Sequence, residues 1–163
     1  MRRRVMLSVA LAAVLGSGLV VAQDGAGSVA ETIAARRGLM TQLATLQSLI
    51  DSRLGASEEA GDLPALGLAA AQSLEAFALL LPPQTNLLGG APAVEGAQTT
   101  AAAAIWDDLP AFQQQLRDVA GLARRASEAG DIAGFRAEWD KVAAACISCH
   151  ESKVFFDPFA AIN

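Results

Sequence analysis

The chain has 163 residues, a length typical of one domain, and 53% of them are hydrophobic. Its 12 basic residues are outnumbered by 17 acidic ones, which gives a formal net charge of −5. This sign argues against nucleic acid as a partner, because phosphates are bound by basic patches.

The start of the chain has the three parts of an export signal. Residues 2–4 are arginines, residues 5–15 are apolar, and the small residues at 20–22 suit a signal peptidase. We therefore predict a signal peptide over residues 1–22 and a mature domain over residues 23–163. The mature protein is expected to be periplasmic.

The alternative for the first segment is a membrane anchor. Its apolar run covers residues 5–22, but two glycines and a serine at 16–18 interrupt it, which favours cleavage and no stable anchor afterwards. Cleavage removes three basic residues and no acidic one, so the mature net charge is −8. That charge is compatible with a basic docking partner or with simple solubility.

The first two helices are predicted from apolar spacing and from end signals. A first helix over about residues 28–53 carries apolar side chains at i, i+4, i+7 and i+11, namely Leu39, Leu43, Leu46 and Ile50. Asp62 is expected to cap a second helix that continues to about Leu81. Pro82 and Pro83 stop it, because proline has no backbone N–H to donate. Residues 82–98 form the one long connection.

The second half of the mature chain predicts two further helices. The third covers about residues 99–129, with a break near Pro110, and the fourth begins after the cap Asp131. Its inner stripe consists of Phe135, Trp139, Val142, Cys146 and Cys149. No segment alternates with period two, so we expect an all-α protein. Short links before the second and fourth helices predict an antiparallel four-helix bundle.

The two cysteines and the only histidine lie together in "CISCH", residues 146–150. Cys-x-x-Cys-His is typical of covalent haem attachment, in which the two thiols form thioethers and the histidine ligates the iron. A thioredoxin-like pair would require a strand, and a structural zinc site would require four ligands. The sequence therefore predicts one haem c per chain, held near the C-terminus by Cys146, Cys149 and His150.

Two residues of the first helix are candidates for the other side of the haem. Met40 is the single methionine of the mature chain, and a thioether is a common sixth ligand of haem iron. Its alternative role is core packing. Arg36 lies one turn earlier and is expected to face a haem propionate, with a solvated helix face as the alternative. For Trp106 and Trp139, haem contact and core packing both remain open.

Four segments together resemble the class II cytochromes c, that is, cytochrome c′ and its low-spin relatives. They are "RRGLM" at 36–40, "IWDDLPAF" at 105–112, "AGDIAGFRAEW" at 129–139 and "CISCH" at 146–150. The resemblance covers essentially the whole mature chain. It implies a periplasmic four-helix bundle and a homodimer formed through faces of the first two helices.

The resemblance also assigns residues. Cys146 and Cys149 match the haem-binding cysteines, His150 the proximal ligand and Arg36 the arginine near a propionate. The position of Met40 faces the distal side of the haem. In low-spin members it is a methionine bound to iron, whereas in five-coordinate members it is a bulky group that does not ligate.

One departure from the family pattern follows the histidine. Family members usually have an aromatic residue and an arginine three and four positions later, where this chain has Lys153 and Val154. The arginine contributes to the electrostatics on the proximal side. For this reason gas-binding behaviour is not carried over from the resemblance.

The sequence thus predicts electron transfer between redox partner proteins, with the iron ligated by His150 and Met40. The alternative is a five-coordinate binder of nitric oxide or carbon monoxide in which Met40 is packed but unbound. A weaker possibility is a haem-bearing subunit that serves assembly. No acid–base pair, nucleophile triad or phosphate loop is recognisable, so an enzyme is not expected.

Overall fold

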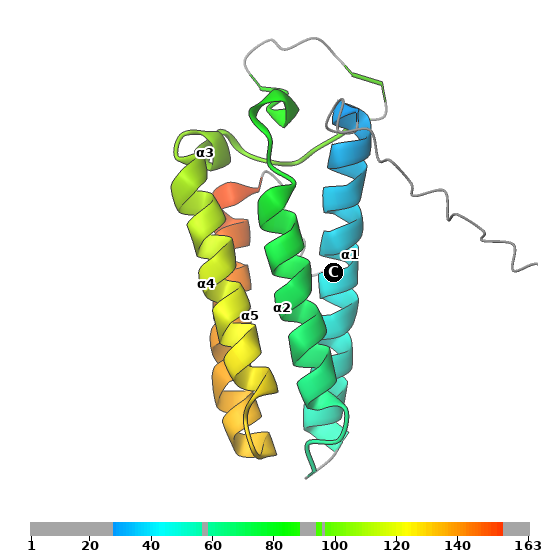
Figure 1. Ribbon diagram of the computed structural model, residues 1–163, viewed down its shortest axis with the longest axis vertical. Coiled ribbons are helices and arrows are strands. Elements are labelled where there is room, and N and C mark those ends of the chain that lie inside the picture. The colour runs from blue at the N-terminus through cyan, green and yellow to red at the C-terminus, as the bar shows by residue number, and fades with distance from the viewer. Residues whose placement is uncertain (1–27, 57–58, 89–93, 96, 155–163) are drawn as a thin grey trace, which may run out of the picture.

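The computed structural model describes residues 28–56, 59–88, 94–95 and 97–154, and four long helices dominate them (Figure 1). These are α1 (Val29–Ala56), α2 (Leu63–Leu79), α4 (Leu109–Ser127) and α5 (Ile132–Lys153). Two short elements, η1 (Pro83–Thr85) and α3 (Ala103–Trp106), lie in the connection between α2 and α4. The predicted signal peptide and its cleavage site lie outside the described residues.

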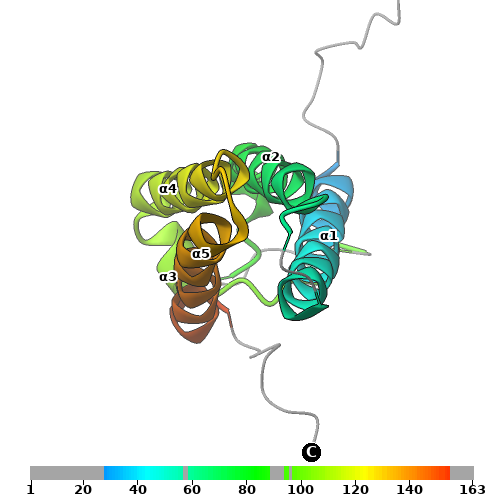
Figure 2. The same cartoon turned by 90° about the horizontal axis from the view of Figure 1, so that it is seen from below.

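Successive long helices run in opposite directions. Figure 1 shows α1 and α4 descending while α2 and α5 ascend, and the end-on view in Figure 2 gives the order α1, α2, α4, α5 around the bundle. The main packed pairs are α2 with α4, α4 with α5, and α1 with α2. The prediction of an all-α antiparallel four-helix bundle is confirmed. None of the described helices is long and apolar enough to cross a membrane.

Side chains that act as caps explain several helix ends. The Ser28 hydroxyl accepts a hydrogen bond from the Glu31 N–H at 3.2 Å, while the Glu31 carboxylate accepts one from the Ser28 N–H at 2.7 Å. This reciprocal pair is a capping box. The predicted cap Asp131 is confirmed, since its Oδ1 accepts a hydrogen bond from the Gly134 N–H at 2.7 Å.

Of two further predicted helix boundaries, only the cap at Asp62 was wrong. Asp62 stands before α2 but makes no capping hydrogen bond, and its carboxylate instead accepts one from Arg53 Nε at 3.1 Å. The break predicted near Pro110 occurs before it, because Asp108 caps α4 through the Ala111 N–H at 3.1 Å. Pro110 then fits in the first turn of α4, where its missing N–H has no helical partner to lose.

The core lies mainly between α2, α4 and α5. Phe135, Trp139 and Val142 are buried as their stripe predicted. Small residues let the backbones approach, and a Cβ on Gly67 would lie only 3.1 Å from Cε2 of Phe135. On α1, Leu39 and Leu43 are only partly buried, whereas Leu46 and Ile50 of the same stripe are buried.

Candidate functional site

Two adjoining cavities lie between α1 and α5, with volumes of about 560 Å³ and about 360 Å³. Both are also walled by residues of α2 and α4. They share the lining residues Met40, Thr41, Leu116, Cys149 and His150. Residues from the first half of α1 and the end of α5 therefore border both cavities.

The two cavities differ in charge. The larger one has an apolar wall and three basic side chains, Arg36, Arg37 and Lys153, but no carboxylate among its lining residues. The smaller one is lined by apolar and uncharged polar groups, among them Leu74, Val119 and Trp139. This combination suits a mostly apolar molecule that carries negative charge at one edge.

The "CISCH" residues lie in the last turns of α5, and three of them, Cys146, Cys149 and His150, line these cavities. Cys146 lines the smaller cavity, while Cys149 and His150 line both, and neither cysteine is in a disulfide. Burial raises the pKa of Cys146 to about 11, with a smaller contribution from Cys149. Burial also raises the pKa of Cys149, against the opposing charge of Lys153. Both thiols are therefore neutral near pH 7, unlike the low-pKa thiolate of a thioredoxin-like pair.

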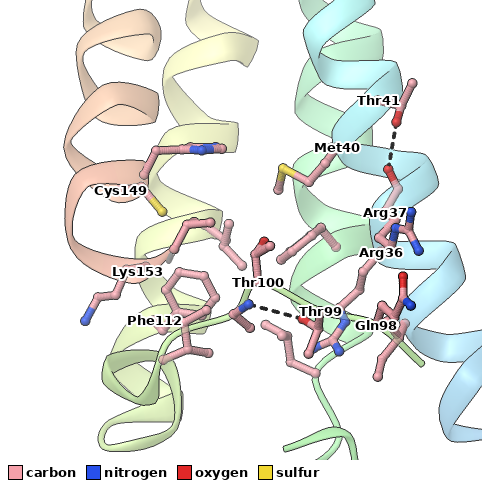
Figure 3. Close-up of a pocket in the computed structure, with 18 residues that line it drawn as sticks. Arg36, Arg37, Met40, Thr41, Gln98, Thr99, Thr100, Phe112, Cys149 and Lys153 are labelled. Atoms are coloured by element: carbon pink, nitrogen blue, oxygen red, sulfur yellow. Dashed lines mark hydrogen bonds between the residues drawn. The ribbon is translucent and has the colours of Figure 1, made fainter. Parts of the chain in front are cut away.

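Met40 lies on α1 opposite this segment. Its side chain is partly buried and packs against the core. Figure 3 shows Met40 and Cys149 extending into the larger cavity from α1 and α5. Because Met40 and His150 line both cavities, the fold brings them to the same space. A coordinating thioether and a thioether that only packs would both occupy this position.

Arg36 is buried, with 5% of its surface exposed, so it does not lie on a solvated helix face. Its Nη2 has no hydrogen-bond partner, and burial lowers its pKa. Its guanidinium lies over the ring of Trp106, whose centroid is 5.8 Å from Cζ. A buried donor without an acceptor is costly, so an acceptor bound in the larger cavity would stabilise this arrangement.

The two tryptophans have different surroundings. Trp139 lines the smaller cavity, stacks on Phe135 with ring centroids 6.0 Å apart, and has a buried Nε1 without a partner. Trp106 lines neither cavity and instead covers Arg36.

Part of the site was not predicted. Residues 98–101, at the end of the long connection and directly after it, line the larger cavity. The unusual length of that connection was the available signal, since long loops without structure of their own are often functional. Lys153 Nζ donates a hydrogen bond to the Ala104 carbonyl at 2.8 Å, so the end of α5 is tied to this region.

The chain was compared with known proteins. A family model described as cytochrome c′ matches residues 31–152. A solved cytochrome c′ from Thermochromatium tepidum is 21% identical with a TM-score of 0.68, and the match covers 78% of this chain and 96% of that one. A second solved cytochrome c′, which has an unusual ligand-controlled dimer dissociation, is 22% identical with a TM-score of 0.62. That match covers 80% of this chain and 98% of the other one. At these identities the likeness shows the fold. No curated protein matches.

Proposed function

We propose, since this chain belongs to the cytochrome c′ family of class II cytochromes c, that it binds nitric oxide or carbon monoxide at its haem. Family membership confirms the resemblance found in the sequence, and with it one covalently attached haem c per chain. The leading sequence prediction was electron transfer, but a cytochrome c′ family match favours the gas-binding alternative. That match, over residues 31–152, carries the proposal.

The residues around the two cavities fit a haem. The two cavities adjoin, their walls are largely apolar, and Cys146, Cys149 and His150 border them within two turns of α5. The basic lining of the larger cavity complements two propionates, and the unpartnered Nη2 of Arg36 is a free donor for one of them.

We assign each residue a role on this basis. Cys146 and Cys149 would form the thioethers, His150 would be the proximal iron ligand, and Arg36 would donate to a propionate. When bound, the haem would supply an iron to which a small ligand could coordinate. The larger cavity is lined by apolar side chains, among them Ile33 and Leu116, which favour an uncharged diatomic ligand, because a charged ligand would lose its hydration there.

Whether Met40 ligates the iron distinguishes the proposed gas binding from electron transfer. Absorption spectra of the oxidised and reduced protein test this point. As a non-ligating group, Met40 only fills space, so wild-type protein should be high-spin and should bind carbon monoxide when reduced. Met40→Leu, which keeps the bulk, should leave both properties unchanged. Extraction with acidified acetone serves as the control, and covalently attached haem should stay with the protein.

Electron transfer remains the second candidate, and the position of Met40 on the boundary shared with His150 favours it. A histidine and a methionine that stay bound in both oxidation states would require little rearrangement on transfer. In that case wild-type protein is low-spin and resists carbon monoxide, and Met40→Leu makes it high-spin and reactive. Those results would replace gas binding with electron transfer between redox partner proteins.

We further propose a periplasmic binding protein rather than an enzyme. The predicted signal over residues 1–22 supports export, and attachment of haem c takes place outside the bacterial cytoplasm. A homodimer is also proposed. Two observations support it. The second similar cytochrome c′ has a ligand-controlled dimer dissociation, and the apolar side chains of Leu49 on α1 and Leu68 on α2 are exposed.

A further inference from the structure

Arg36 is the one charged side chain that is buried among the described residues. Within that part of the chain it forms no ion pair, and its Nη2 makes no hydrogen bond. Its guanidinium instead lies over the ring of Trp106, 5.8 Å from the ring centroid. This distance is within the range of a cation–π interaction, which strengthens when the cation is shielded from water.

Trp106 is the last residue of α3, and α3 is fastened to the end of α5. Lys153 Nζ donates to the Ala104 carbonyl at 2.8 Å, and the Ala102 N–H donates to the Lys153 carbonyl at 3.0 Å. An isolated bridge between Ala101 and Val154 adds to these bonds. The chain that directly follows His150 therefore holds the short helix that carries Trp106.

We propose that Trp106 is a positioning residue that holds the guanidinium of Arg36 in the larger cavity and thereby sets the reduction potential of the haem. This inference rests on the proposed haem site. Trp106 lines neither cavity, so it acts through Arg36 and not by direct contact with the haem.

The direction of the effect follows from charge. A positive charge near the iron disfavours the oxidised state, which carries one more positive charge than the reduced state, so it raises the potential. Without the Trp106 ring, the guanidinium of Arg36 would lose its cation–π contact and would be held in the cavity by the proposed propionate alone. It would then move toward water, as the neighbouring Arg37 already does. The charge would be farther from the iron, and the potential would fall.

A double-mutant cycle on the haem-loaded protein tests this, with the potential measured by redox titration. Arg36→Gln should lower the potential, and Trp106→Leu should lower it in the same direction by a smaller amount. In the Arg36→Gln background, Trp106→Leu should have no further effect, because the charge that it positions is gone. Trp106→Phe, which keeps an aromatic face, should recover part of the wild-type value. Trp139→Phe is the matched control, and its shift should be equal in both backgrounds.

An equal shift by Trp106→Leu in both backgrounds, or no shift in either, would overturn the inference. If Trp106→Leu yields no haem protein, the cycle is run with Trp106→Phe. A smaller shift that vanishes in the Arg36→Gln background is then expected, and an equal shift in both overturns the proposal. Failure of the proposed function is distinguishable, because wild-type protein would then lose its haem on extraction or would resist carbon monoxide.

Discussion

The two sides of the bundle are held together differently. Between α2 and α4, small residues bring the backbones close, and the Arg124 guanidinium donates hydrogen bonds of 2.6 to 2.9 Å to the Glu75 carboxylate. Between α1 and α5, cavities of about 560 and 360 Å³ separate the helices, and the buried Arg36 has an unpartnered nitrogen. The α2–α4 side is packed by protein side chains alone. The α1–α5 side has cavity volume and hydrogen-bond donors without acceptors, which a further group could occupy and satisfy.

This difference arises from side chains and not from helical periodicity. All four long helices carry apolar stripes, but Gly67, Ala71 and Ala123 on the α2–α4 side leave no space between backbones. On the α1–α5 side the facing groups include thiols, an imidazole and a thioether. These groups are better suited to binding a haem than to packing against one another. We therefore expect mutations on the α1–α5 side to affect haem binding, and mutations on the α2–α4 side to affect stability with haem binding preserved.

The largest effect is expected on the α1–α5 side, from Cys146→Ala or Cys149→Ala. Either change removes a predicted thioether, so the yield of haem-loaded protein should fall sharply. The apo chain should fold poorly, because large core truncations alone cost about 2–5 kcal/mol and total stability is only about 5–15 kcal/mol. Haem absorbance and near-ultraviolet circular dichroism measure the two effects.

Ser148→Ala is the matched control, because Ser148 lies on the same turn of α5 but is exposed. It should leave haem loading unchanged. A haem-free cysteine variant with a native near-ultraviolet spectrum would mean that the α1–α5 side is stable without its cofactor, and the contrast between the two sides would fail.

An intermediate effect is expected on the α2–α4 side, from Gly67→Ala. The new Cβ would lie 3.1 Å from Phe135 Cε2 and 3.4 Å from the Ala123 carbonyl oxygen, so the Phe135 ring or α2 must shift slightly. Overpacking of this kind costs about 1–3 kcal/mol. Gly38→Ala on α1 is the control, since nothing lies within 4 Å of its Cβ, and it should instead stabilise the helix by up to about 1 kcal/mol. Denaturant unfolding of both variants checks the pair, and carbon monoxide binding should survive in each.

The sequence predicted the bundle better than it predicted the details of the site. Periodicity located four long helices, and the "CISCH" spacing located one wall of the cavities. Leu39 and Leu43 lie on the predicted apolar stripe of α1 but are only partly buried, whereas Leu46 and Ile50 of the same stripe are buried. Apolar spacing alone does not distinguish these two environments.

Other contacts could not be predicted because they join distant parts of the chain. The Lys153–Ala104 bond spans 49 residues, and the Trp106–Arg36 contact joins α3 to α1. No local pattern encodes either one. By contrast, Asp131 was predicted correctly as a cap because its partner, Gly134, is three residues away.

The smallest effect is expected from the Arg124–Glu75 pair on the α2–α4 side. The geometry is favourable, with two guanidinium nitrogens on one carboxylate and a shortest distance of 2.6 Å, and Glu75 raises the pKa of Arg124. Both side chains are 41% exposed, however, and water and salt screen exposed charges. Glu75→Gln should therefore lower the urea midpoint less than Gly67→Ala does, and the loss should shrink in high salt. Arg53 and Asp62, which are 55% and 51% exposed, provide the comparison, and Asp62→Asn should have a still smaller effect. If Glu75→Gln instead prevented haem loading, the α2–α4 side would contribute to the cofactor site, because its ion pair would then matter for more than the packing of two helices.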